Sequence, residues 1–226
     1  MTEFNTPLLD CIETETAPNP THSVIWLHGL GADGSDFAPL VPQLHPVNRP
    51  AIRFVFPHAP VRPITINNGF AMRAWYDVFP PDPIRREDGP GIRASQQSIE
   101  ALIARENGRG IPTGKIVLAG FSQGCALTLH TGLRLNQKLA GMIGLSGYLP
   151  LADSFTRERH SANQDTPIFL AHGTLDPVVN FSRAQATRQI LTDLDYPVTW
   201  KTYAMPHAVC PEEIVDIAGF LRQILI

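Results

Sequence analysis

The feature that most constrains the fold of this chain is a regular alternation of short apolar runs with longer helix-like segments. The apolar runs are rich in β-branched residues and nearly continuous, which is typical of strands buried on both faces of a parallel sheet. Parallel neighbours are joined by crossover helices, so we expect a mostly parallel central sheet with helices on both faces. Strands are predicted at His22–Leu27, Ala51–Phe56, Lys115–Ala119, Gly141–Leu145, Pro167–Ala171 and Val198–Tyr203. Helices are predicted at Phe37–Leu44, Ile92–Glu106, Gln123–Leu135, Arg183–Leu194 and Glu212–Leu225, and Leu8–Thr14 is a candidate edge strand.

The length and charge of the chain narrow the class of protein. The 226 residues fit one α/β domain over residues 1–226. The composition is 43% hydrophobic and 17% charged, as in an ordinary globular protein. The net charge of -3, without a cluster of basic residues, argues against a nucleic-acid partner.

The N-terminal sequence and the cysteine content point to a compartment. The first residues, MTEFNTPLLD, lack the basic region and apolar core of a signal peptide. No apolar run is long enough for a transmembrane helix. Cys11, Cys125 and Cys210 are too few and odd in number for a disulfide framework. We therefore expect a cytoplasmic protein.

One region, at about residues 57–91, interrupts the alternation of strands and helices. It contains seven prolines together with several large apolar residues, among them Trp75 and Tyr76. Loops of this length in compact domains often serve a function. Two interpretations stay open: the segment packs its own hydrophobic side chains on the sheet, or it also forms a wall of a binding site.

The stretch WLHGLGADGSDF, residues 26–37, raises a second choice. Its glycines at 29, 31 and 34 have the G-x-G-x-x-G spacing of a dinucleotide-binding loop. Such a loop should be followed, about 20 residues later, by an acidic residue that holds the ribose hydroxyls. The next predicted strand reads AIRFVFPHAP and ends without a carboxylate. The dinucleotide interpretation also leaves the His-Gly pair at positions 28 and 29 unexplained.

The strongest motif is Gly120-Phe121-Ser122-Gln123-Gly124, a G-x-S-x-G sequence between a predicted strand and a predicted helix. This is the setting of the nucleophile elbow of α/β-hydrolases, in which a strained turn exposes the serine hydroxyl above the sheet. The alternative is an ordinary serine N-cap of the helix. We interpret Ser122 as a catalytic nucleophile.

A serine nucleophile needs a base and an acid that orients the base. In α/β-hydrolases these follow the serine in the order acid, then histidine. Asp176 lies in the loop after the strand PIFLA, whereas the competing Asp153 and Asp165 have no strand directly before them. His207 is the last histidine of the chain and the only one beyond Asp176. The order therefore predicts Asp176 as the acid and His207 as the base.

The G-x-G-x-x-G stretch is then explained as part of an oxyanion hole. One donor is the N–H of the residue after the nucleophile, Gln123, and a second comes from an early strand-to-helix loop. We assign the second donor to Leu30, since flanking glycines let its N–H turn toward the developing oxyanion. Each such donor contributes about 3–4 kcal/mol in the transition state. His28 is interpreted as a residue that holds this loop.

Metal binding is the remaining interpretation of the histidines. His28, His172 and His207 all lie at predicted strand ends, so their side chains could converge. No H-x-x-x-H or C-x-x-C spacing accompanies them, and each has a simpler role. We expect neither a metal nor a cofactor.

The sequence also resembles a known family, the small carboxylesterases and acyl-protein thioesterases of the phospholipase/carboxylesterase type. The resemblance covers most of the chain and rests on VIWLHGLGADGSDF, MRAWYD, EDGPGIRAS, GFSQGCAL, GLSGYLP, HGTLDPVV and MPHAVCPEEI. It implies an α/β-hydrolase fold without a large cap domain, the triad and oxyanion donors named above, and an acyl site lined partly by the loop of Trp75. One departure is Cys125, where the family commonly has glycine. We interpret it as a small buried residue, although a thiol near the site is the alternative.

We therefore expect a serine hydrolase that cleaves carboxylic esters of short to medium acyl chains through an acyl-enzyme intermediate. The substrate is a small-molecule or lipid-like ester. The alternatives are an acyl-protein thioesterase, which acts on acylated proteins, and a lysophospholipase, both using the same site. A binding protein that has lost catalysis should lack a triad member, and none is missing from the sequence.

Overall fold

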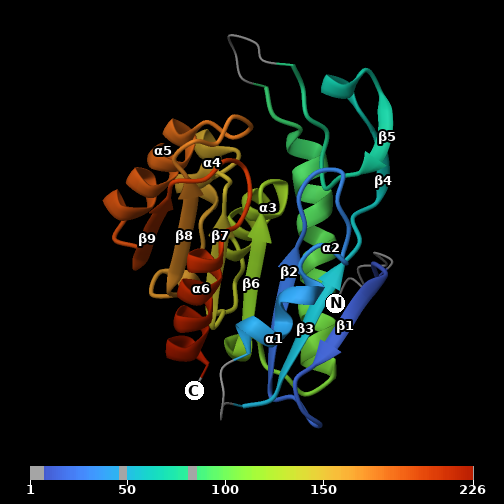
Figure 1. Ribbon diagram of the computed structural model, residues 1–226, viewed down its shortest axis with the longest axis vertical. Helices are drawn as coiled ribbons and strands as arrows, with labels where there is room; N and C mark the ends of the chain where they lie inside the picture. The colour runs from blue at the N-terminus through green and yellow to red at the C-terminus, as the bar shows by residue number, and fades with distance from the viewer. Residues whose placement is uncertain (1–7, 46–49, 81–85, 226) are drawn as a thin grey trace.

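The computed structural model describes residues 8–45, 50–80 and 86–225 of the chain (Figure 1). Within these residues seven strands form one sheet in the order β1-β3-β2-β6-β7-β8-β9. All neighbouring pairs are parallel except β1 and β3, which are antiparallel. The strands of the sheet are β1 (Cys11–Glu15), β2 (His22–Leu27), β3 (Ile52–Pro57), β6 (Ile116–Phe121), β7 (Gly141–Leu145), β8 (Ile168–Gly173) and β9 (Val198–Tyr203).

Helices cover both faces of this sheet, as the alternation predicts (Figure 1). Successive side chains of a strand point to opposite faces, so Val24 and Trp26 join one core while Ile25 and Leu27 join the other. The first core also receives side chains of α1 (Val41–Leu44) and α6 (Pro211–Ile224). The second receives side chains of α2 (Gly89–Gly108), α3 (Gln123–Gly132), α4 (Ala152–Glu158) and α5 (Phe181–Asp193).

The predicted strands of the sheet are confirmed, with shifts of one to three residues at several ends. The candidate edge strand at Leu8–Thr14 forms as β1 and pairs with β3. The predicted helix Phe37–Leu44 is only a 3-10 turn, Ala38–Leu40, followed by the four-residue α1. Helix α4 was not predicted. It is seven residues long and buries only Phe155, so it has too few turns to show a helical period.

The proline-rich segment contains structure that the sequence did not reveal. A hairpin of β4 (Val61–Ile64) and β5 (Phe70–Arg73) stands apart from the main sheet. Its connection contains Asn68 and Gly69, which have φ angles of 54° and 78°, a conformation that these two residue types tolerate. Of the seven prolines, Pro81 and Pro83 lie outside the described residues.

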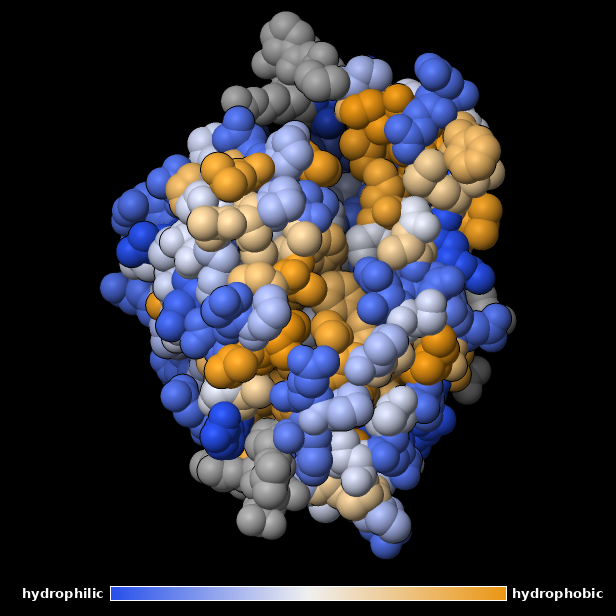
Figure 2. Space-filling model, in the orientation of Figure 1, coloured by the Kyte–Doolittle hydropathy of each residue, from blue (hydrophilic) through white to orange (hydrophobic). Residues whose placement is uncertain are grey.

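The hairpin exposes apolar side chains. Val61 and Phe70 are 62% and 69% exposed. Figure 2 shows hydrophobic residues gathered at the upper right, where Figure 1 draws β4 and β5. None of the helices in the described ranges is both long and apolar enough to span a membrane.

Candidate active site

The turn between β6 and α3 positions Ser122 at the carboxyl end of the sheet. Ser122 has φ 55° and ψ −116°, which a residue other than glycine rarely adopts. Its N–H donates to the carbonyl of Leu145 on β7 at 2.8 Å. This hydrogen bond fixes the turn to the neighbouring strand and holds the serine above the sheet edge.

The two glycines of the motif are required by close backbone contacts. A Cβ at Gly120 would lie 2.3 Å from backbone atoms of Gly124. A Cβ at Gly124 would lie 2.2 Å from the carbonyl oxygen of Leu27. Since real side chains never come this close to backbone atoms, both positions must be glycine for the helix to start directly behind the serine.

Ser122, His207 and Asp176 lie in one line of hydrogen bonds. The Nε2 atom of His207 is 2.9 Å from Ser122 Oγ, and its Nδ1 is 2.7 Å from Asp176 Oδ2. His207 lies in the loop between β9 and α6, with 15% of its side chain exposed. Its ring also packs against Phe121, with 4.7 Å between ring centroids. The structure thus brings together the three residues that the sequence order selected.

Asp176 is held by the turn that follows β8. Its Oδ1 accepts the N–H groups of Val178 and Val179 at 2.8 and 2.9 Å, and its side chain is fully buried. An aspartate followed by proline commonly forms such a turn. The competing Asp153 and Asp165 are exposed. Asp176 therefore presents its second oxygen to His207 in a fixed orientation.

His172 is a neighbour of the acid that sequence reasoning considered only as a metal ligand. It is fully buried, and its Nε2 donates to the carbonyl of Val179 at 2.9 Å and lies 3.3 Å from Asp176 Oδ2. Burial lowers the pKa of His172, which favours the neutral imidazole. In the sequence, only the spacing of four residues between His172 and Asp176 points to this contact.

The predicted oxyanion donors lie beside the nucleophile. Leu30 and Gln123 line the same cavity as Ser122. Among the described residues, neither backbone N–H donates a hydrogen bond. The N–H of Gln123 belongs to the first turn of α3, where N–H groups have no partner within the helix. Both amides are thus available to an oxyanion formed at Ser122.

The loop that carries Leu30 is fixed from several sides. Burial lowers the pKa of His28, which favours the neutral imidazole. Its Nδ1 donates to the carbonyl of Gly29 at 2.7 Å, and its Nε2 accepts the N–H of Ala59 at 3.0 Å. Gly31, at φ 78°, donates its N–H to the carbonyl of Arg73 at 2.9 Å. His28 therefore holds the loop, as interpreted from the sequence.

Trp75 lies behind the cavity wall instead of in the predicted acyl-site lining. Its side chain is completely buried, and its Nε1 donates to the carbonyl of His28 at 2.9 Å. The side chain of Gln123 clamps the same loop, accepting the N–H of Trp75 at 2.7 Å and donating to the carbonyl of Tyr76 at 2.8 Å. The sequence marked the right loop, but Tyr76 and Val78 are the residues that reach the cavity.

The cavity above Ser122 has a volume of about 320 Å³. Its wall is mostly apolar, which suits an acyl chain better than a charged substrate. The apolar and aromatic lining residues are Leu30, Ala32, Tyr76, Val78, Phe121, Tyr148, Val178 and Val179.

Cys125 packs directly behind the nucleophile turn. It is fully buried, and a Cβ at Gly144 or Gly147 would lie 2.8 or 2.6 Å from its Sγ. Burial raises the pKa of its thiol to about 12. Cys125 is thus a small buried side chain.

In the described ranges, no three residues of the types His, Cys, Asp or Glu gather into a metal-binding group.

The fold and the arrangement of this site define the class: the protein has the α/β-hydrolase fold, with no large cap domain among the described residues. The model of the phospholipase/carboxylesterase family matches residues 10–225. The chain therefore belongs to this family and is a carboxylesterase-type serine hydrolase.

Relatives with curated names agree with this assignment. The chain is 43% identical over 212 residues to acyl-protein thioesterase 1 of Neurospora crassa, covering 90% of this chain and 86% of the relative. It is 39% identical over 208 residues to acyl-protein thioesterase 1 of Yarrowia lipolytica, covering 90% and 92% of the two chains.

Solved structures show the same fold. Arabidopsis thaliana SOBER1 superposes with a TM-score of 0.84 at 30% identity, covering 91% of this chain and 99% of that one. Zea mays acyl-protein thioesterase 2 superposes with a TM-score of 0.80 at 27% identity, covering 95% and 99%.

Proposed function

We propose that this protein hydrolyses carboxylic esters of short to medium acyl chains through a Ser122–His207–Asp176 triad. The observation that carries the proposal is the line of hydrogen bonds from Ser122 Oγ through His207 to Asp176. It ends at a mostly apolar cavity that two unpartnered N–H groups border.

The first half of the reaction forms an acyl-enzyme. Ser122 Oγ attacks the carbonyl carbon of the ester while His207 Nε2 accepts the serine proton. The N–H groups of Leu30 and Gln123 bind the oxyanion, and Asp176 stabilises the imidazolium that forms. His207 then gives the proton to the leaving alcohol, and the acyl group stays on Ser122.

In the second half, water replaces the alcohol. His207 takes a proton from the water, whose oxygen attacks the acyl carbonyl carbon. The tetrahedral intermediate again places its oxygen at the two N–H groups. Its collapse breaks the bond to Ser122 Oγ, which recovers its proton from His207, and releases the carboxylic acid.

The test is hydrolysis of nitrophenyl esters with acyl chains of two to sixteen carbons. We expect a maximum at short or middle lengths, and a fall in kcat of about 10⁴-fold or more in Ser122→Ala. Ser98→Ala, in α2 and away from the cavity, is the matched control and should keep full activity. Retained turnover in the folded Ser122→Ala variant would reject the nucleophile. A folded wild-type protein without turnover on esters or thioesters would favour a binding role.

Thioester hydrolysis on acylated proteins is a second candidate, favoured by the relatives named acyl-protein thioesterase 1. It uses the same residues, with a thiol as the leaving group. Comparing an S-acyl peptide with an oxygen ester of the same acyl chain separates the two. A kcat/KM much higher for the S-acyl peptide would make the protein a thioesterase, and lysophosphatidylcholine serves as the probe of lysophospholipase activity.

A further inference from the structure

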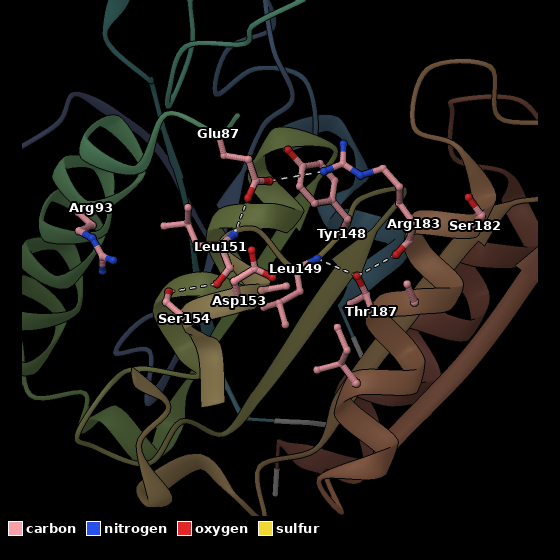
Figure 3. A pocket seen from close by; sticks show the side chains of 13 residues that line it. Glu87, Arg93, Tyr148, Leu149, Leu151, Asp153, Ser154, Ser182, Arg183 and Thr187 are labelled. Carbon is pink, nitrogen blue, oxygen red and sulfur yellow. Dashed lines mark hydrogen bonds and ion pairs between the residues drawn. The ribbon is translucent and has the colours of Figure 1, made fainter. Parts of the chain in front are cut away.

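A second and larger cavity lies next to the catalytic one. It has a volume of about 570 Å³ and lies between the segment after β7, helix α2 and helix α5 (Figure 3). Its lining is partly apolar, through Leu149, Leu151, Ala186 and Ile190. The reaction proposed above assigns no role to this space.

The two cavities share a wall. Tyr148 and Arg183 belong to the lining of both. The guanidinium of Arg183 lies 3.4 Å from the centroid of the Tyr148 ring, a close cation–π contact. The hydroxyl of Tyr148 is 3.3 Å from that of Tyr76, another lining residue of the catalytic cavity.

Glu87 holds Arg183 in this position. The Nη2 atom of Arg183 is 3.5 Å from Glu87 Oε1, and Glu87 Oε2 accepts the N–H of Leu151 at 2.7 Å. Figure 3 shows Arg183 extending from α5 past Tyr148 toward Glu87. We call Glu87, Arg183 and Tyr148 together the partition, since they stand where the two cavities meet.

The mechanism defines which part of the substrate faces the partition. His207 protonates the leaving group, so the leaving group lies on the side of His207. The carbonyl oxygen points to the N–H groups of Leu30 and Gln123. The acyl chain would then leave Ser122 on the side away from His207, within the cavity that Tyr76 and Tyr148 also line. A chain that grows in this direction reaches the partition.

We propose that the partition closes the inner end of the acyl site and sets the longest acyl chain that the enzyme accepts efficiently. This inference rests on the proposed ester hydrolysis. The side chains of Arg183 and Glu87 are 41% and 21% exposed. An alkyl chain that extends past them would displace the ion pair and place apolar atoms against charged groups, which is unfavourable. Beyond the partition, the apolar residues of the second cavity offer a surface that longer chains would cover if the ion pair were absent.

The test replaces the charged residues that separate the two cavities. Arg183→Ala combined with Glu87→Gln removes the bulk of the arginine without leaving an unpaired carboxylate. We expect kcat/KM for long acyl chains to rise relative to a four-carbon ester, by about fourfold for each methylene group newly buried. Arg188→Ala, on the exposed side of the same helix, is the matched control and should leave the ratio unchanged.

Glu87→Gln alone is a gentler variant, because it keeps the size of both side chains. It should shift the chain-length profile in the same direction but less. Profiles of both variants that overlay on the wild type, in folded proteins, would overturn the proposal.

A binding measurement separates this inference from the proposed function. In a Ser122→Ala background, calorimetry with saturated fatty acids measures the acyl site without turnover. We expect the affinity to stop rising beyond a certain chain length when the partition is intact, and to continue rising when Arg183→Ala and Glu87→Gln are added. Equal plateaus would overturn the partition even if ester hydrolysis is found, and unequal plateaus would support it even if it is not.

Discussion

Asp176 and Glu106 are two carboxylates with completely buried side chains, and their partners differ in kind. Glu106, in the last part of α2, contacts three arginines: Arg53 at 3.0 Å, Arg109 at 3.2 Å and Arg105 at 3.6 Å. Its charge is compensated by permanent cations. A buried carboxylate with such partners stabilises one arrangement of the chain, and its negative charge is already neutralised by them.

Asp176 is surrounded by neutral groups instead. Two backbone N–H groups donate to its Oδ1, and its Oδ2 lies 2.7 Å from Nδ1 of His207. The Nε2 of His172 lies 3.3 Å from Oδ2 but donates its proton to the carbonyl of Val179. No permanent cation touches it among the described residues. In the proposed mechanism, its charge is therefore compensated fully only when His207 becomes an imidazolium. The partners of the two buried carboxylates, more than their burial, thus separate the catalytic role proposed for Asp176 from the structural role of Glu106.

The substitution Asp176→Asn should have the largest effect on activity. The amide keeps the shape but favours the wrong tautomer of His207 and carries no charge. We expect kcat to fall by about 10⁴-fold, with little change in the free energy of unfolding. Nitrophenyl ester kinetics and urea unfolding measure the two quantities. Asp153→Asn, at an exposed position, is the control, and comparable kcat values for the two variants would refute the role of Asp176.

Glu106→Gln should show the opposite pattern. It leaves three arginines around a neutral side chain, and we expect the free energy of unfolding to fall by about 3 kcal/mol. This value is at the lower end of the usual cost of breaking a buried ion pair. We choose it because the side chain of Arg109 is 37% exposed, so water can solvate part of its charge. The kcat of the folded variant should equal that of the wild type. Loss of activity without loss of stability would show that Glu106 acts on the site.

Glu213 offers a third case, a fully buried carboxyl that forms no ion pair within the described ranges. Burial raises its pKa from the ordinary value of 4.5 to about 8. The folded protein therefore binds this proton more tightly than the unfolded chain does. The stability that the protonated form contributes is complete below the ordinary pKa and is lost as the pH rises through about 8.

The substitution Glu213→Gln removes this titration. Measured by urea unfolding, the variant should have a stability similar to the wild type at about pH 5 and should exceed it at about pH 9. Glu212→Gln, at the exposed neighbouring position, should follow the wild type at both values. A difference between Glu213→Gln and wild type that does not change with pH would contradict the raised pKa.

The smallest expected effect concerns the support of the oxyanion loop. Trp75→Phe removes the hydrogen bond from Nε1 to the carbonyl of His28. One such bond is worth about 1 kcal/mol, and we expect kcat to fall roughly fivefold to tenfold with little change in KM. Trp200→Phe, on the edge strand β9, is the matched control. If both variants have the same kcat, the loop does not depend on Trp75.

Much of the sheet and of the candidate site could be predicted because the relevant signals are local. Continuous apolar runs marked the strands, and the glycines of G-x-S-x-G marked the turn at Ser122. The hairpin of β4 and β5 and the helix α4 were missed, since each has only four to seven residues and too little buried surface to produce a period. The contact between His172 and Asp176 was missed, because it forms only when the turn after β8 folds back toward the end of that strand.

From the amino-acid sequence alone, the order of the strands of the main sheet and of its longer helices could be predicted, together with the chemical types at the site. Apolar periodicity and backbone sterics act over a few residues, so they can be read without the fold. The packing of the whole chain was needed to show that Tyr76 and Val78 line the cavity, whereas Trp75 is buried outside its lining. It also placed Arg183 between two cavities. Such contacts join residues far apart in the chain, and their geometry is set by the packing of the whole sheet and its helices.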